Sequence, residues 1–436
     1  NLAVIERDRA LQVVEILESA FRNADPGQAS GDTVTARQIL DAAVPSINAI
    51  ETTQPQVFAR MAATLARVEL DLAQNERALQ WVERGLAAAK TESPPKEIVF
   101  SLLFSGAMGY AREGDSTKAA PMVDLLREAG GAGSPEYYLA QARVALARSD
   151  WRTSSEILKR AVTSFSKMSA ESAVANELRW LLSTALQRGE LYSEERLMLE
   201  SAIEWQLASL GESHPWVMQT RIRLIRSIGR TREDVDRAIE LFEELIIDIS
   251  RVYGDDSSLT ANARSELGIM LFESDRLQLS TNQLRLSHNA LNNLYGPQQI
   301  RTLRAGLNLS YALREMGTES SLSESEQIIK GVVRASVEKF GYDAPLSSYA
   351  YTQFVKTLLK RQRFGEALEL AVSSEFEGTI STRSLPNLKA QLGALNDATK
   401  SAGCGKDQSI INQCALAAIR ETRIRAAITK LELSAN

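Results

Sequence analysis

The sequence predicts an all-α solenoid, which is a stack of helix–turn–helix units, and three regularities predict it. Glycines recur at Gly211, Gly254, Gly296 and Gly341, at steps of 43, 42 and 45 residues. Each follows one helical apolar run and precedes another, so each is expected to end one helix before the next begins. A period near 40 that contains two helices is typical of an α-solenoid.

Prolines give the second regularity. A proline at the first turn of a helix loses no hydrogen bond, so prolines at a regular step indicate helix starts. The step is 40, 40, 80, 82 and 48 residues, and the two doubled steps predict hidden units that begin at Ser172 and Ser257. The prolines are Pro55, Pro95, Pro135, Pro215, Pro297 and Pro345.

Small residues twelve positions apart give the third regularity. In a helix–turn–helix pair this spacing places both residues where the two helices come closest, and a longer side chain would push the helix axes apart. Val355 with Ala367 keeps the spacing with one larger member. The other pairs are Ala66 with Ala78, Ala107 with Ala119, Ala142 with Ser154, and Gly268 with Ser280.

Composition agrees with a helical protein. The 436 residues include only 24 glycines and 11 prolines, and the 6% aromatic share is low for a β-rich chain. The 44% apolar fraction is ample for a continuous core, and no compositional break marks a domain boundary. Fifty basic and 55 acidic residues give a net charge of −5, which argues against general nucleic-acid binding. No apolar run approaches the length of a membrane span.

In chain order, residues 1–54 are expected to form capping helices. These are one helix over 2–23 and a second, capped by Thr33 or Thr35, that reaches Ile50 and is kinked or ended by Pro45. Residues 55–380 hold eight units, and the seventh carries an insertion, Thr318 to Ser323, before its second helix.

Residues 381–436 are expected to close the array with two further helices. The first runs over 381–400, and the second begins near residue 409 after a turn at Gly403-Cys404-Gly405. The final helix is rich in basic residues, which we interpret as the polar cap that the open end of a solenoid needs. They are Arg420, Arg423, Arg425 and Lys430.

The units resemble the tetratricopeptide repeat. The first unit supplies Leu65-Ala66, Ala78 and Gly85 at the matching positions, and Gly211-Glu-Ser-His-Pro215 matches the Gly-x-x-His-Pro junction of the kinesin-light-chain variant. The resemblance implies a right-handed superhelix, and in such arrays the first helix of each unit lines a concave face that binds a peptide or protein segment. A solvated face is the alternative for every candidate. By repeat phase, the candidates are Arg221 and Arg223 in the fifth unit, Asn262 and Glu266 in the sixth, and Arg304, Asn308 and Tyr311 in the seventh.

A second resemblance concerns the start of the chain. The phrase Phe21-Arg-Asn-Ala24-Asp25-Pro26, then Gly31 and Thr35-Ala36-Arg37-Gln-Ile-Leu40-Asp41, resembles the segment before the repeats in bacterial membrane-anchored serine/threonine protein kinases. The resemblance implies a periplasmic sensor or docking module and not the kinase itself. The opening at Asn1 is expected of a mature or excised portion of a longer protein.

Two cysteines, Cys404 and Cys414, stand ten residues apart in one short segment that contains Gly403 and Gly405. We expect a local disulfide, which favours an oxidising compartment. A metal half-site and two unpaired thiols are the alternatives. A metal site needs at least two more ligands, and the two histidines lie far away in the sequence, so neither a metal nor a cofactor is expected.

Catalytic motifs are not recognisable. Gly403-Cys-Gly405-Lys406 lacks the first glycine and the Ser or Thr of a phosphate-binding loop. His214 and His288 are 74 positions apart and begin no kinase catalytic loop. We interpret His214 as a capping or packing residue and His288 as a surface residue. The chain is therefore expected to be non-enzymatic.

Together these features predict a non-catalytic sensor module that binds a protein or peptide and contacts the membrane only through a span outside this chain. Ligand binding is expected to change the superhelix or to bring two copies together as a homodimer. The alternative is a cytoplasmic scaffold or regulator with reduced cysteines that binds proteins through the same face.

Overall fold

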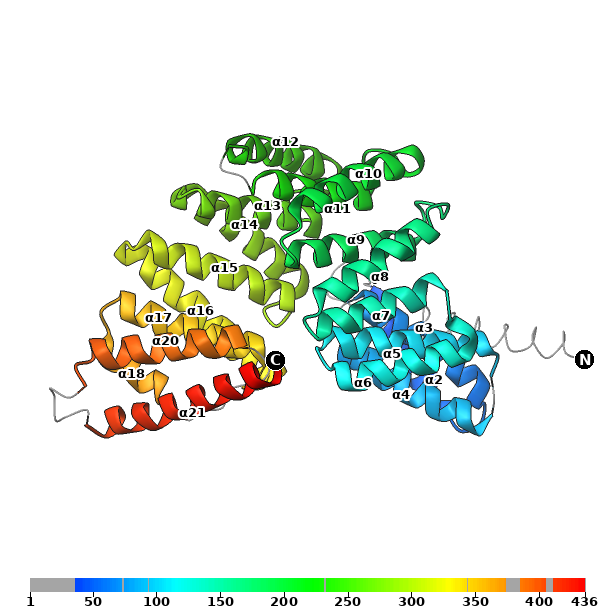
Figure 1. Cartoon of the computed structure of the whole chain (residues 1–436), viewed down its shortest axis with the longest axis horizontal. Coiled ribbons are helices and arrows are strands. Elements are labelled where there is room, and N and C mark those ends of the chain that lie inside the picture. The colour runs from blue at the N-terminus through cyan, green and yellow to red at the C-terminus, as the bar shows by residue number, and fades with distance from the viewer. Residues whose placement is uncertain are drawn as a thin grey trace, which may run out of the picture. The chain divides into compact units, whose positions relative to one another are not determined.

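The computed structural model describes residues 36–435 except 73, 93, 231–232, 343, 374–384 and 405–410 (Figure 1). The helix expected over 2–23, the N-terminal phrase before Ala36 and the segment from Gly405 to Asp407 lie outside the described residues. Within the described residues all regular secondary structure is helical. The prediction of an all-α repeat fold is confirmed.

The helices form two compact units, unit 1 up to Leu210 and unit 2 from Gly211. Unit 1 contains α2 (Ala36–Ala49), α3 (Pro55–Asp71), α4 (Asn75–Thr91), α5 (Lys96–Arg112), α6 (Ser116–Leu126), the π-helix η1 (Arg127–Gly131), α7 (Pro135–Ala147), α8 (Trp151–Ser164), α9 (Ala173–Arg188) and α10 (Tyr192–Leu210). Unit 2 contains α11 (Pro215–Ile228), α12 (Val235–Tyr253), α13 (Ser258–Glu273), α14 (Leu277–Tyr295), α15 (Ile300–Met316), α16 (Glu319–Phe340), α17 (Pro345–Lys360), α18 (Phe364–Ala371), α20 (Leu385–Ser401) and α21 (Ile411–Ala435).

From α3 to α18 the helices alternate as first and second members of helix pairs, with the odd-numbered helix first. Within each unit, successive first helices also pack on one another: α3, α5, α7 and α9 in unit 1, and α11, α13, α15 and α17 in unit 2. The core lies between the first and second helices, where Phe58, Leu102 and Leu139 of unit 1 and Phe242 and Ile329 of unit 2 are fully buried.

Helix starts follow the predicted prolines and serines. Four of the six prolines are the first residue of a helix, Pro95 directly precedes α5, and Pro297 lies shortly before α15. The hidden starts are also confirmed. The Ser172 hydroxyl accepts a hydrogen bond from the amide of Ala175 at 3.3 Å, and the Ser257 hydroxyl accepts one from the amide of Thr260 at 3.2 Å. Each serine therefore caps its helix.

Helix ends follow the predicted glycines. Gly211, Gly254, Gly296 and Gly341 directly follow α10, α12, α14 and α16, with φ of +77°, +87°, +79° and +80°. Only glycine adopts these angles without steric cost, so the 42- to 45-residue period reflects a backbone requirement at the end of each second helix.

The small residues twelve apart do meet. The Ser154 hydroxyl donates to the carbonyl of Ala142 at 3.0 Å, and the Ser280 hydroxyl donates to the carbonyl of Gly268 at 2.7 Å. A serine side chain reaches the backbone of a neighbouring helix only where the two helices nearly touch. A Cβ atom on Gly268 would lie 2.6 Å from Cγ of Leu284, which leaves no room for a side chain there.

The seventh pair corrects one prediction. The stretch Thr318 to Ser323 was expected before the second helix, but Thr318 caps α16 and the helix runs from Glu319. Ser310 and Ser325, fifteen apart, make the contact that other pairs make at twelve, with the Ser325 hydroxyl 2.8 Å from the carbonyl of Ser310. The three extra residues therefore lengthen the helix and do not form a loop.

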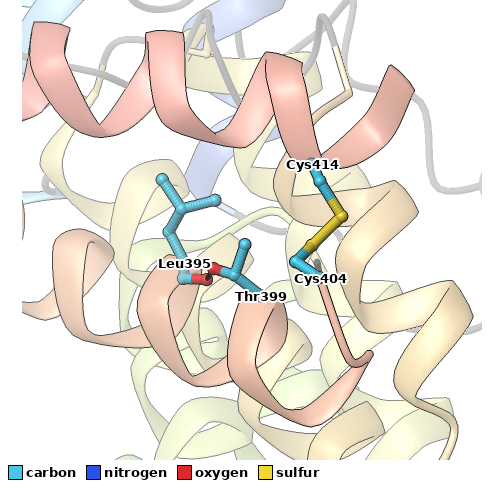
Figure 2. Close-up of a disulfide and its surroundings, with 4 residues drawn as sticks. All are labelled: Leu395, Thr399, Cys404 and Cys414. Atoms are coloured by element: carbon cyan, nitrogen blue, oxygen red, sulfur yellow. Dashed lines mark hydrogen bonds between the residues drawn. A yellow bond between two sulfur atoms is a disulfide. The ribbon is translucent and has the colours of Figure 1, made fainter. Parts of the chain in front are cut away.

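The C-terminal end is held by a disulfide. Cys404 follows α20 and Cys414 lies near the start of α21, with their Cα atoms 5.6 Å apart (Figure 2). The predicted bond is therefore present. Nearby, the Thr399 hydroxyl donates to the carbonyl of Leu395 within α20.

The structure corrects the expected role of Arg420 and shows that Pro45 does not end its helix. Arg420 is buried and donates to the carbonyls of Ala371 and Ser373 at 2.9 and 2.7 Å, so it anchors α21 to the end of α18 and is not part of a polar cap. Helix α2 continues past Pro45 to Ala49.

None of the described helices combines the length and the apolar character needed to cross a bilayer.

Candidate functional site

The first helices share a register that defines a common face. In each pair we number from the first-helix residue at the close helix contact, for example Ala66 or Gly268. The residues six and two before it, and one and five after it, lie within about 60° of one another on a helix. We call these four positions the first-helix row. In α3, Arg60, Thr64, Arg67 and Asp71 occupy the row, and they are the exposed residues between Val57 and Asp71. In α3 the row therefore faces away from the core, whereas in α5, α7 and α9 some row positions, such as Met108, Ala140 and Leu181, are buried.

Six of the seven predicted ligand residues fall on the first-helix row of unit 2. Among them, the side chains of Asn262, Arg304 and Tyr311 are exposed, and the other three are half-buried. Those three are Arg223, Glu266 and Asn308.

Arg221 lies elsewhere. It is two residues from Arg223 and therefore about 200° around the helix. Its counterpart in α15 is Gly306, where an added Cβ would contact Val332 and His288 of the second helices. The structure does not bring Arg221 together with the other six residues.

Ion pairs join α11 to α13 along the row of unit 2. Nη2 of Arg226 lies 2.7 Å from Oε1 of Glu273, and Nε of Arg226 lies 3.6 Å from Oε2 of Glu266. Desolvation raises the pKa of Glu266, and the positive charges of Arg226 and Arg223 oppose that shift. The carboxylate of Glu266 is thus held between arginines in a partly dry environment.

Aromatic, amide and guanidinium groups lie on or beside the row in α13, α15 and α17. The rings of Phe272 and Tyr311 lie 4.9 Å apart, and the guanidinium of Arg314 lies 4.7 Å from the Tyr311 ring centre. Nη1 of Arg314 donates to Oε1 of Gln353 at 2.7 Å. Tyr349 is 37% exposed, and desolvation raises its pKa.

Sequence reasoning missed Arg314, Gln353 and Tyr349. Gln353 and Tyr349 stand at the row positions of Glu266 and Asn262, so carrying the predicted register into the eighth pair would have found them.

Unit 1 places an ionic cluster on its row. Glu177 of α9 accepts from two arginines at the same oxygen, Oε1: Nη2 of Arg112 lies at 3.1 Å and Nη2 of Arg143 at 3.2 Å. Nη1 of Arg112 also donates to the carbonyl of Leu70 at 2.8 Å. Desolvation lowers the pKa of Arg143 to about 10 and raises that of Asp71, which also interacts with Arg112. No residue of this cluster was predicted, although the small-residue spacing gives its register.

The structure places one histidine at the start of a helix and the other between packed helices. Nδ1 of His214 accepts from the amide of Trp216 at 3.2 Å, which confirms the capping role. The expected surface position of His288 is wrong, because it is half-buried beside Gly306 and desolvation lowers its pKa. In the part of the chain that the structure describes, no three His, Cys, Asp or Glu side chains gather where they could hold a metal ion.

Neither a protein-family model nor a curated protein sequence matches the chain. Several solved structures are similar at low identity. The TPR-like repeats of a kinesin light chain from Podosopora anserina are 16% identical, cover 46% of this chain and 92% of their own, and give a TM-score of 0.40. The apo quorum sensor NprR from B. thuringiensis is 12% identical over 86% of this chain and 97% of its own, with a TM-score of 0.48. Apo RapI is 10% identical over 85% and 98%, with a TM-score of 0.46.

Proposed function

We propose that the chain is a non-catalytic recognition module that binds a protein or peptide segment on the first-helix row of unit 2. The observation that carries the proposal is the group around Tyr311. Two exposed tyrosines, Tyr311 and Tyr349, stand on neighbouring first helices above the buried, hydrogen-bonded side chains of Arg314 and Gln353, which fix the surface that the tyrosines present. Tyrosine and arginine are enriched among the residues that dominate binding energy in protein interfaces.

The dimensions of the row fit an extended segment. Packed helices lie about 8–10 Å apart, so four first helices span roughly 25–30 Å. An extended chain advances about 3.3 Å per residue, so eight or nine residues would cross the row. Asn262 and Asn308 carry both donors and acceptors, which suits the backbone amides of such a segment.

The test starts from peptides selected for binding to the full chain. We expect Tyr311→Ala and Tyr349→Ala each to weaken the selected peptides by about tenfold or more, which is the loss of an interface anchor. Tyr295→Ala is the matched control, because Tyr295 is 43% exposed but lies at the end of α14, a second helix. Equal losses in all three variants, or none, would contradict the proposal.

We propose further that this module is the periplasmic sensor of a bacterial membrane-anchored serine/threonine kinase. The bond between Cys404 and Cys414 supports an oxidising location. The resemblance of residues 21–41 to the segment before the repeats of such kinases supports the parent protein. A bound segment would change the arrangement of the repeats or bring two copies together, and so report across the membrane.

Alkylation of free thiols at lysis of the native host tests the location. We expect Cys404 and Cys414 to be protected from alkylation until they are reduced. Two freely alkylated thiols would instead indicate a cytoplasmic scaffold that binds its partners through the same row.

A further inference from the structure

We propose that the first-helix row of unit 1 is a second binding site, and that it takes an acidic peptide segment of a partner protein. The cluster of Arg112, Arg143 and Glu177 is its centre. The inference shares one assumption with the proposed function, that a first-helix row binds an extended segment. It concerns a different unit and a different ligand chemistry.

Each of the four first helices of unit 1 contributes a charged side chain to this place. Asp71 ends α3, Arg112 ends α5, Arg143 lies in α7 and Glu177 lies in the first half of α9. The side chains of Arg112, Arg143 and Glu177 are 25%, 16% and 26% exposed. The cluster is thus partly dehydrated, yet a ligand can reach it from the row.

Positive charge is in excess at the cluster. Arg67 interacts electrostatically with Asp71, and Arg188 interacts electrostatically with Arg143. With Arg112 and Glu177, the interacting groups are therefore four arginines and two carboxylates. Arg67 and Arg188 are both exposed and flank the partly buried centre. An excess of two positive charges stands out in a chain whose net charge is −5. Charge complementarity therefore favours an anionic occupant.

The arginines also hold unused hydrogen-bonding capacity. A guanidinium has five N–H donors in a planar fork that matches a carboxylate. Arg112 uses its donors on Glu177 and on the carbonyl of Leu70, and Arg143 uses Nη2 on the same oxygen of Glu177. Nε of Arg143 is buried and has no hydrogen-bond partner among the described residues. One internal carboxylate oxygen therefore serves two guanidinium groups, and a ligand carboxylate can compete for them.

An acidic peptide fits better than a nucleic acid. The cluster is a single compact centre with one exposed arginine at each of two flanks, whereas nucleic acid is held by a basic surface that follows many phosphates. A glutamate side chain is narrow and carries its charge at the tip, so it can enter between the first helices while its backbone lies along the row.

The experiment measures the anisotropy of a labelled octaglutamate peptide titrated with the full chain, with octaglutamine as the uncharged reference. We expect octaglutamate alone to bind, more weakly as salt is added. Arg112→Gln should weaken binding about tenfold to a hundredfold, because hydrogen bonds to charged groups are strong. Arg160→Gln is the matched control, since it removes one positive charge from the exposed surface of α8 in the same unit.

Glu177→Gln gives the sharper result. Removal of the internal carboxylate releases both arginines, so octaglutamate should bind several-fold tighter, the opposite sign to Arg112→Gln. If the cluster were purely structural, the two substitutions would not change the affinity for octaglutamate in opposite directions. Arg143→Gln is not needed for the test, because its burial can make that variant unfold, whereas helical content verifies the other two.

Each of the following outcomes would overturn the inference: octaglutamate that binds no better than octaglutamine, Arg112→Gln that matches Arg160→Gln, or a single-stranded octanucleotide that displaces the peptide at equal concentration. Tyr311→Ala should leave octaglutamate binding unchanged. Loss of octaglutamate binding in that variant would move the acidic segment to unit 2 and disprove the site in unit 1. If the selected peptides bind without any dependence on Tyr311, the proposed function fails, but the octaglutamate test of unit 1 still stands.

Discussion

Units 1 and 2 are built from the same helix pairs, but a cluster in which several charged side chains share one carboxylate lies on first helices in unit 1 and around a second helix in unit 2. In unit 1, Arg112, Arg143 and Glu177 meet on the first-helix row. In unit 2, Glu326 lies in α16, a second helix, with a side chain only 7% exposed. It accepts from Lys330 at 2.7 Å, from Arg363 at 2.6 Å and from Arg361.

Clusters of similar composition therefore occupy different places in the two units. Arg361 and Arg363 belong to the turn between α17 and α18, so Glu326 ties that turn to the preceding pair. The cluster of unit 1 faces the row and has donors to spare. Both clusters join neighbouring pairs, but only the first-helix cluster of unit 1 lies where the proposed acidic segment would reach it.

The largest expected effect separates these two roles. Glu326→Ala should lower the free energy of unfolding by about 3 kcal/mol, because it removes a buried carboxylate and leaves two half-buried arginines, Arg361 and Arg363, without the anion that they share. Glu177→Gln should cost less than half as much, since the side chain of Glu177 is itself 26% exposed and accepts from its two arginines at a single oxygen. Denaturant unfolding of both variants measures this, and equal losses would show that both clusters are structural.

Acid titration examines the same contrast. Desolvation favours the neutral form of Glu326, but hydrogen bonds from Lys330, Arg363 and Arg361 outweigh it and lower the pKa to about 2. Because the folded pKa lies below the unfolded one, the stabilisation is full above about pH 4.5 and is lost as the pH falls towards 2. Melting between pH 7 and 2.5 should show this loss in the native chain and a flatter profile in Glu326→Gln.

The next effect concerns the covalent bond, which only unit 2 has. Reduction of Cys404–Cys414 should destabilise unit 2 by about 2–3 kcal/mol, because the bond closes a short loop in the unfolded chain. Unit 1 has no cysteine, so its protection against hydrogen exchange should not change. A Cys404→Ser/Cys414→Ser variant should melt at the temperature of the reduced chain and be insensitive to reductant. Equal destabilisation of both units would mean that they do not unfold separately.

The smallest expected effects concern two helical glycines of unit 2. Gly268→Ala should lower the free energy of unfolding by about 1 kcal/mol, because overpacking against Leu284 outweighs the gain in helix propensity. Gly331→Ala should raise the free energy of unfolding by about 0.5–1 kcal/mol, since an added Cβ at this exposed position of α16 meets nothing within 4 Å. Urea midpoints that shift in the same direction would contradict the close approach of α13 and α14.

Much of the fold could be predicted from the sequence because backbone geometry limits residue choice at its turning points. Left-handed φ requires Gly254 and Gly296, helix starts tolerate Pro135 and Pro215, and the close helix contact admits only a residue such as Gly268. These constraints act locally, so they are visible in the spacing of single residue types.

The candidate site was less predictable because it depends on which side chains meet across helices. The register identified Asn262 and Tyr311, but the partners of Arg112 and Arg420 lie 65 and up to 49 residues away. Net charge and periodicity do not reveal such pairings. The sequence assigns Arg420 to the polar cap for the same reason, since a basic residue in a terminal helix gives no local sign that it binds the carbonyls at the end of another helix.

The start of α16 shows how this chain can change length. Three additional residues are close to one helical turn, so the serines at positions 310 and 325 still face each other and the following pair keeps its contacts. Length can therefore vary in steps of about one turn at the beginning of a second helix without disturbing the neighbouring units. Such a position is a natural insertion point, through which one module of the array can acquire a longer arm while the rest of the scaffold stays as it was.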